Sequence, residues 1–273
     1  MVMRRTPPPI YPSRPGGSAR DHYRRLRAAG AARRRITLAA VSGGAALVLL
    51  VLLGPRAALA GGLLAAAAAL VWQWRRDDHR TWLQGARGEE RTARRLQRLE
   101  MDGYVVLHDR QIPGSRANLD HLVICPSGLV VVVDSKQWGR NRFVKGDGRS
   151  LRVGRVGGKK VVAAAAFERR RVAELLARDL GPADAPPVAA VLAIHGGRLP
   201  AWRTPVVDGI PLVPARRIRS WIKELDDGRP DIGLLGLVGE ASHRVFPPYV
   251  EPSGPAPAAA PRYDRRTPRG RTA

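Results

Sequence analysis

Two aspartates and one lysine stand within an otherwise strongly apolar stretch, residues 118–136, with the sequence NLDHLVICPSGLVVVVDSK. Asp120 lies in the first of its two apolar runs, and Asp134 and Lys136 close the second. Residues i and i+2 of a strand share one face, so Asp134 and Lys136 point the same way. If the two runs pair as an antiparallel hairpin around the Pro-Ser-Gly turn, Asp120 lies at the strand end that faces Asp134.

These residue types suit metal-assisted hydrolysis of a phosphodiester. Two converging carboxylates could hold a divalent cation, since Mg²⁺ takes oxygen ligands and usually keeps several waters. Lys136 could orient a metal-bound water or help to deprotonate it. The plainer alternative is that Asp120 and Asp134 cap turns and that Lys136 is a solvated strand end, because an acid-x-lysine triplet often arises by chance. Spacing alone favours this plainer alternative.

The elements that must position these residues form an α/β domain that starts near Gly85. The segment GEERTARRLQRLE has Ala93, Leu96 and Leu99 on one face, which predicts a helix. Short β-branched runs bounded by turn residues predict strands at 104–107, 119–124, 129–134 and 187–194. The remaining expected elements are a hairpin at 142–153, a long helix at 161–180 and an amphipathic helix at 216–225.

The stretch from Gly85 to about Trp138 resembles the nuclease-related domain, NERD, a branch of the PD-(D/E)xK nuclease superfamily. The matching pieces are GARGEERTARRLQRL, NLDHLVICPSGLVVVVDSKQW and the apolar spacing between them. The resemblance is weaker through the following helix and strand. It implies a restriction-endonuclease-like fold, with a mixed central sheet flanked by helices, and a nuclease site that uses Mg²⁺ or Mn²⁺.

Carried over position by position, the resemblance also implies site residues. Glu89 matches the glutamate of the first helix, with Glu90 beside it as a substitute. Asp120 matches the acid of the superfamily, and Asp134 and Lys136 match its (D/E)xK pair. Asp120, Asp134 and Glu89 would then be metal ligands. Lys136 would position the nucleophile and stabilise developing charge.

The sequence departs from the superfamily pattern in two places. Asp replaces the commoner Glu at position 134, which shortens the ligand arm. Some members carry a Gln in the helix after the lysine, where this chain has Ala-Phe-Glu at 166–168. No residue is assigned to that role.

Composition favours anionic partners. The 273-residue chain has a formal net charge of +24 and a pI near 11.6, which suits nucleic acid or the anionic face of a membrane. Ten of its arginines lie in residues 1–35 against the single acid Asp21, so this arm is expected to bind anionic lipid. The single cysteine, Cys125, excludes an intramolecular disulfide and a cysteine-based zinc cluster.

Two uncharged apolar stretches, residues 36–53 and 57–74, follow the arm. Each is about 27 Å long as a helix, close to the hydrocarbon thickness of a bilayer. They predict a transmembrane hairpin with a tight turn at 54–56. The alternatives are a buried soluble hairpin, or a cleaved signal peptide with its cut site at Ala58–Ala60.

Arginines flank both apolar stretches on the outside of the hairpin, at 33–35 before the first and at 75, 76 and 80 after the second. The positive-inside rule then places both termini and the α/β domain in the cytoplasm, in a multi-pass membrane protein with two spans.

The sequence thus predicts four parts: a disordered basic arm at 1–35, whose last part, Arg20–Arg35, could form a short surface helix, a transmembrane hairpin at 36–74, a NERD-like domain at 82–246 and a disordered Pro/Ala/Arg tail at 247–273. The predicted function is that of a membrane-anchored nuclease that hydrolyses DNA or RNA phosphodiesters with Mg²⁺. The alternative is a non-catalytic module on the same fold that binds nucleic acid or lipid. A further alternative is a membrane scaffold or sensor whose arms bind a partner.

Overall fold

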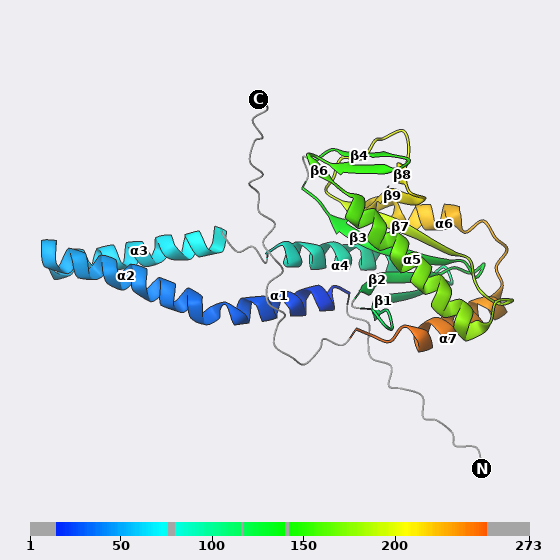
Figure 1. The fold of residues 1–273 in the computed structure, drawn as a ribbon, viewed down its shortest axis with the longest axis horizontal. Coiled ribbons are helices and arrows are strands. Elements are labelled where there is room, and N and C mark those ends of the chain that lie inside the picture. Colours follow the sequence, from blue (N-terminus) through cyan, green and yellow to red (C-terminus); the bar gives the residue numbers. More distant parts are fainter. Residues whose placement is uncertain (1–14, 76–79, 116, 140–141, 250–273) are drawn as a thin grey trace, which may run out of the picture. The chain divides into compact units, whose positions relative to one another are not determined.

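A computed structural model describes residues 15–75, 80–115, 117–139 and 142–249 of the chain (Figure 1). The described residues divide into two compact units. One is an α/β domain made of residues 80–249 together with residues 15–21, and the other is a helical hairpin within residues 22–75.

The described part of the α/β domain is built on a six-stranded sheet with the order β1-β2-β3-β7-β9-β8. The strands are β1 (Val105–Gln111), β2 (Asn118–Ile124), β3 (Val130–Gln137), β7 (Val188–His195), β8 (Val206–Val207) and β9 (Ile210–Pro214). β1, β2 and β3 pair antiparallel, β3, β7 and β9 pair parallel, and β8 returns antiparallel to β9. The sheet is therefore mixed, which confirms the fold class that the sequence predicts.

Helices cover both faces of this sheet. Figure 1 shows α4 (Arg80–Glu100) and α5 (Lys159–Leu180) on opposite sides of it. α6 (Ile218–Leu225), which follows the 3₁₀ turn η1 (Ala215–Arg217), packs with α4, and α7 (Ile232–Val245) packs with α5. Burial on both faces explains why β3 is a continuous apolar run rather than an alternating one.

The side chains of β3 alternate between the two cores. Val130 and Val132 belong to the core beneath α5, and Val131 and Val133 belong to the core beneath α4. The same alternation assigns each polar residue at the end of β3 to one face. A small three-stranded sheet, β4 (Val144–Asp147), β5 (Ser150–Val153) and β6 (Val156–Gly157), contains the hairpin expected at 142–153.

The C-terminal part of the domain extends beyond the boundary that the sequence predicts. Gln111 donates its N–H to the Pro247 carbonyl, Arg110 bridges to Pro248, and Tyr249 donates its N–H to the Asp109 carbonyl. Residues 247–249 therefore lie along the open edge of β1 instead of starting a disordered tail. An edge strand offers unpaired backbone groups, and this segment satisfies some of them. The rest of the expected tail lies outside the described residues.

Residues 17–35 of the expected disordered arm are helical, over a longer span than the short surface helix expected within residues 20–35. They form α1 (Gly17–Ala29) and the first turns of α2 (Ala31–Leu53). Tertiary contacts explain the start of α1: the Ser18 N–H donates to Asp109 Oδ2 at 2.8 Å, and Arg20 forms an ion pair with Glu90. The first fourteen residues of the arm lie outside the described residues.

The second unit contains two long apolar helices, α2 and α3 (Pro55–Arg75). Residues 31–53 and 55–74 are long and apolar enough to cross a membrane, with mean hydropathy of 2.5 and 1.5. A Cβ added at Gly61 or Gly62 would meet the side chain of Leu49 or Ala46, so small residues let the two helices approach closely. Large apolar side chains such as Leu53 and Leu64 are about 70% exposed, which argues against a buried hairpin of a soluble protein.

Candidate active site

Asp134 and Lys136 lie at the carboxyl end of β3, on the face that α5 covers. The Lys136 Nζ contacts Asp134 Oδ1 at 2.5 Å. Asp134 is 3% exposed, and its Oδ2 has no hydrogen-bond partner among the described residues. One oxygen of this buried carboxylate is thus held by the lysine, and the other lacks a donor or cation.

Asp120 lies on β2, the neighbouring strand, and on the same face of the sheet. Its Oδ2 accepts the backbone N–H of Ser135 at 2.8 Å, so its carboxylate lies directly beside the end of β3. His121, the next residue, points to the opposite face, where its Nε2 lies 3.2 Å from Ser135 Oγ. The hairpin register therefore places Asp120 toward Asp134 and Lys136, as the sequence predicts.

Glu89 reaches these residues from α4. Gly88 allows α4 to approach the ends of β3 and β7 closely, because a Cβ there would lie 3.3 Å from the Gln137 Cβ and 3.7 Å from His195 Cδ2. Burial, together with the Asp109 and Asp134 carboxylates and against the opposing effect of Lys136, raises the pKa of Glu89 from its ordinary 4.5 to about 7.

Glu168, on α5, is a buried acid near Asp134 to which the sequence alone assigned no role. Burial raises its pKa well above the ordinary value, and the nearby Asp134 carboxylate adds to this effect. It belongs to the buried stripe of α5, between Ala165 and Val172. An acid at a core position of an amphipathic helix is the signal that would have found it, because such residues are rarely buried without a partner.

Acidic groups outnumber cations in this cluster. Burial, and then the Glu89 and Asp134 carboxylates, raises the pKa of Asp120 well above its ordinary range. Burial lowers the pKa of Lys136, but Asp134 and Asp120 outweigh that effect and raise it above the ordinary value. Repulsion among crowded carboxylates is what a divalent cation would relieve.

The donor chemistry of the cluster fits a hard cation, although no complete ligand set is already assembled. Among the described residues, no group of three or more His, Cys, Asp or Glu side chains is spaced to hold a metal ion. Mg²⁺ commonly uses only one or two protein carboxylates and keeps several waters. The partnerless Asp134 Oδ2 and the neighbouring Asp120 carboxylate suit that mode.

A second polar cluster lies next to the site at Asp109, at the edge of the sheet. The Asp109 backbone has a positive φ of 48°, and its carboxylate accepts the Ser18 N–H at 2.8 Å and the Asn118 Nδ2 at 2.9 Å. Among the charged groups that shift the pKa of Glu89, Asp109 has the largest effect. Asp109 could not be identified from sequence alone, because its carboxylate is placed by contact with Ser18, 91 residues away along the chain.

On the α4 face of the sheet, buried polar side chains form a continuous hydrogen-bonded chain, which we term the polar relay: His108, His121, Ser135, Thr92 and His195. Successive members lie 2.8, 3.2, 2.9 and 2.8 Å apart between their hydrogen-bonding atoms. Burial lowers the pKa of His108 and of His195 to about 4, and it lowers that of His121 well below its ordinary value. The three rings are therefore neutral at physiological pH.

Neutral rings restrict how protons are arranged in the polar relay. The two Nδ1 atoms of His108 and His121 face each other, so one must donate and the other accept. Ser135 donates to Thr92, and the Thr92 hydroxyl lies within hydrogen-bonding distance of both His195 Nε2 and the Gly88 carbonyl. The relay ties α4, through Thr92, to β3, through Ser135, and so fixes the helix that carries Glu89 against the strand that carries Asp134 and Lys136.

Replacing Thr92 by valine is expected to destabilise the domain by about 1–3 kcal/mol, because Ser135 and His195 would each lose a buried partner. Thr92→Ser keeps the hydroxyl and should cost less than half as much. Thermal unfolding of the purified full-length variants in detergent measures the difference. Equal loss of stability in both variants would show that the methyl group, rather than the hydroxyl, carries the effect.

Comparison with protein families supports the interpretation of this geometry. Residues 84–195 match the family model described as NERD, nuclease-related domain. The match runs from α4 to the end of β7, and so includes Glu89, Asp120, Asp134, Lys136 and Glu168. No curated protein and no solved structure matches the chain. Residues 84–195 of this chain therefore form a nuclease-related domain.

Proposed function

We propose that the chain is a membrane-anchored nuclease that hydrolyses phosphodiester bonds of DNA or RNA with Mg²⁺ or Mn²⁺. The observation that carries the proposal is the grouping of buried carboxylates around Lys136 at the carboxyl end of β3, within a nuclease-related domain. Such a grouping is costly for stability unless it serves a ligand, and it lies where α/β sheets usually bind ligands.

In this proposal, Asp120 and Asp134 hold the cation together with bound waters, and Glu89 holds it directly or through one of those waters. A bound Mg²⁺ or Mn²⁺ would supply a Lewis acid and lower the pKa of a bound water. The cation's partners on the protein come from two adjacent strands and from α4, so they are positioned by the hairpin register and by the polar relay.

Lys136 acts in this proposal as a cation and not as a base. Its raised pKa keeps the ammonium charged at neutral pH, so it stabilises negative charge that develops on the phosphate. Glu89, which faces the same cluster from α4, is placed to hold or position the attacking water. Glu168 lies close enough to Asp134 to help hold Lys136 in place.

The second candidate function is a non-catalytic module that binds nucleic acid or lipid on the same fold. It is favoured by one observation, namely that no three-ligand metal group exists among the described residues. The net charge of +24 serves this alternative equally well.

A cleavage assay with the full-length protein in neutral-lipid nanodiscs separates the two candidates. The substrates are end-labelled single- and double-stranded DNA and RNA, each tested with Mg²⁺, with Mn²⁺ and with EDTA. We expect products with either metal and none with EDTA. If wild-type protein releases no more product than the Asp134→Asn variant in any metal, the binding module replaces the nuclease as the conclusion.

We further propose that α2 and α3 anchor the chain in a membrane, with both termini and the α/β domain in the cytoplasm. Arginines at 33–35 precede the apolar part of α2, and Arg56, at the start of α3, is the one charged residue between the two apolar stretches. The arginines of the N-terminal arm would then lie near the anionic leaflet, at about 1 kcal/mol of attraction each.

Cysteine labelling in intact cells tests this orientation. We expect an impermeant thiol reagent to label Arg56→Cys but not Arg87→Cys, which is exposed on α4 of the domain. The native Cys125 is buried and serves as the internal control in wild-type protein. Labelling at position 87 without labelling at position 56 would invert the topology, and recovery of the protein in the soluble fraction would remove the membrane anchor.

A further inference from the structure

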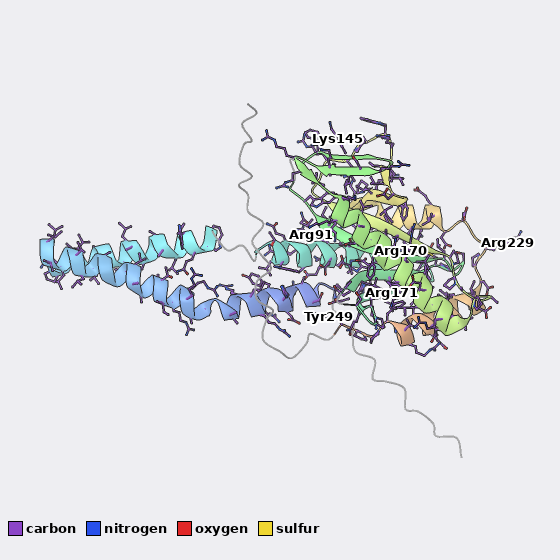
Figure 2. The ribbon with its side chains drawn as sticks, in the orientation of Figure 1. Arg91, Lys145, Arg170, Arg171, Arg229 and Tyr249 are labelled. Carbon is purple, nitrogen blue, oxygen red and sulfur yellow. The ribbon has the colours of Figure 1, made fainter. Side chains whose placement is uncertain are left out.

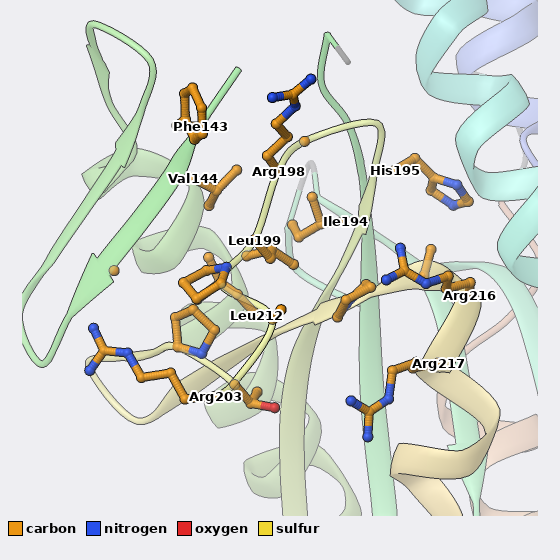
Figure 3. Close-up of a pocket in the computed structure, with 18 of the residues that line it drawn as sticks. Phe143, Val144, Ile194, His195, Arg198, Leu199, Arg203, Leu212, Arg216 and Arg217 are labelled. Carbon is orange, nitrogen blue, oxygen red and sulfur yellow. The ribbon is translucent and has the colours of Figure 1, made fainter. Parts of the chain in front are cut away.

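A large pocket lies in the α/β domain beside the candidate active site (Figure 3). It has a volume of about 1050 Å³ and is formed by β4, by the end of β7 and the loop that follows it, by the end of β9 and by η1, with one arginine from α4. Gly196 begins the loop with a φ of +79°, and a Cβ there would collide with the Trp138 carbonyl. The loop therefore needs glycine to turn away from β7 and open the pocket.

The charge of the pocket lining has one sign. Its cationic residues are Arg95, Lys145, Arg198, Arg203, Arg216 and Arg217. No Asp or Glu occurs among its described lining residues, and none of these cations forms an ion pair with a carboxylate in the described part of the chain. Cations that form no ion pair among the described residues favour an anionic ligand.

Two aromatic side chains stand at this pocket with open faces. Trp202 is 85% exposed and Phe143 is 58% exposed, although both are large apolar residues. The guanidinium carbon of Arg198 lies 5.6 Å from the centre of the Phe143 ring. Exposed rings interleaved with arginines are the arrangement on which successive bases of a single strand stack, while the cations follow its phosphates.

The pocket and the candidate active site share one edge of the sheet. β3, β7 and β9 are parallel, so their carboxyl ends meet at this edge. Lys136 on β3 pairs in register with Ile194 on β7, and Ile194 and His195 line the pocket. The pocket therefore reaches the strand that lies directly beside the one that carries Lys136.

We propose that this pocket binds an unpaired segment of a nucleic-acid strand and presents it to the candidate active site. The choice of single-stranded nucleic acid as substrate class rests on the proposed function, whereas the binding itself does not require cleavage. Stacking on Trp202 needs bases that are free of a duplex. The volume lies near the upper end of the range for small-ligand pockets, about 300–1,000 Å³, which suits a few nucleotides.

A lipid surface fits this pocket less well. Anionic headgroups form a broad surface that attracts flat or helical basic patches. Here the arginines line a concave site that carries exposed aromatic rings, on which bases can stack but headgroups cannot.

The test measures binding of a fluorescent oligothymidine to full-length protein in neutral-lipid nanodiscs with EDTA, so that cleavage does not contribute. The R198A/R203A/R216A variant is expected to bind at least about tenfold more weakly at about 50 mM salt. Its salt slope should fall by about 2, since each phosphate contact in a single strand contributes about 0.7. Trp202→Ala should weaken binding by about fivefold or more, and Trp202→Phe should restore most of it.

The matched control is R170A/R178A/R229A, which removes three exposed arginines that do not line the pocket. Figure 2 shows Arg170 and Arg229 away from Lys145 at the pocket. Both triple variants keep the same arms and lose the same net charge, so a larger effect of the first triple assigns the binding to the pocket.

Three results would overturn the inference: equal effects of the two triple variants, no effect of Trp202→Ala, or binding of duplex as tight as binding of single strand. If the R198A/R203A/R216A variant binds added anionic-lipid vesicles less tightly than wild type but binds oligothymidine equally well, the pocket is assigned to lipid instead. Pocket-dependent binding by a protein that cleaves nothing supports the pocket and refutes the proposed nuclease. If the wild-type protein cleaves nucleic acid and the pocket variants bind it as tightly as wild type, the proposed nuclease is supported and the pocket is refuted.

Discussion

Replacing Asp134 by asparagine is expected to reduce metal-dependent cleavage by at least about 10³-fold. The change is nearly isosteric, but it removes the charge that holds Lys136 Nζ at 2.5 Å and the oxygen that has no other partner among the described residues. Asp120→Asn should act similarly, because that carboxylate faces the same point from the next strand. Initial rates on an end-labelled oligonucleotide, with metal in excess, measure the loss.

The control is Asp184→Asn, which removes one exposed carboxylate outside the site and should leave the rate unchanged. Thermal unfolding of each variant shows whether the fold is retained. A folded Asp134→Asn protein that cleaves at the wild-type rate would exclude this carboxylate from the chemistry.

The stability of the metal-free protein is expected to fall as the pH rises from about 5 to about 8. Glu89 has a folded pKa of about 7 against its ordinary 4.5, so the folded state binds a proton more tightly than the unfolded state does. This stabilisation is fully present below about pH 4.5 and is lost as the pH rises through about 7. The shift corresponds to about 3 kcal/mol, and the raised pKa values of Asp120 and Glu168 act in the same direction.

Mg²⁺ should reverse this loss at about pH 8 and have little effect at about pH 5, because it binds the ionised carboxylates. Unfolding temperatures with Mg²⁺ and with EDTA at the two pH values measure the linkage. Glu89→Gln is the matched variant: it should be more stable than wild type in EDTA at about pH 8, since it lacks the buried charge. Equal stabilisation by Mg²⁺ at both pH values would contradict a site made of these acids.

The hairpin that carries Asp120, Asp134 and Lys136 could be predicted from sequence because its information is local. A turn of fixed length sets the register, and a two-residue period then assigns each side chain to a face. The assignment of Glu89 came from the family resemblance, and the structure places it where burial and the other acids raise its pKa.

What could not be predicted depends on distant parts of the chain. The parallel pairing of β3 with β7 joins strands that are separated by α5 and a whole small sheet. α7, whose apolar residues are interrupted by glycines, has no clear helical stripe in the sequence, and Glu168 becomes a site residue only because α5 packs against the end of β3. The start of α1 likewise depends on Asp109, which belongs to another element.

The contact between residues 15–21 and the rest of the α/β domain determines how a soluble fragment of the protein should be designed. Along the chain, the α/β domain begins before the two apolar helices and resumes after them, so the hairpin is an insertion within the domain and not a leader in front of it. A soluble fragment cut at residue 80 would leave the Asp109 carboxylate without the Ser18 N–H and Glu90 without Arg20. Joining residue 21 to residue 80 through a short flexible linker, and ending at Tyr249, would preserve these bonds in a water-soluble protein.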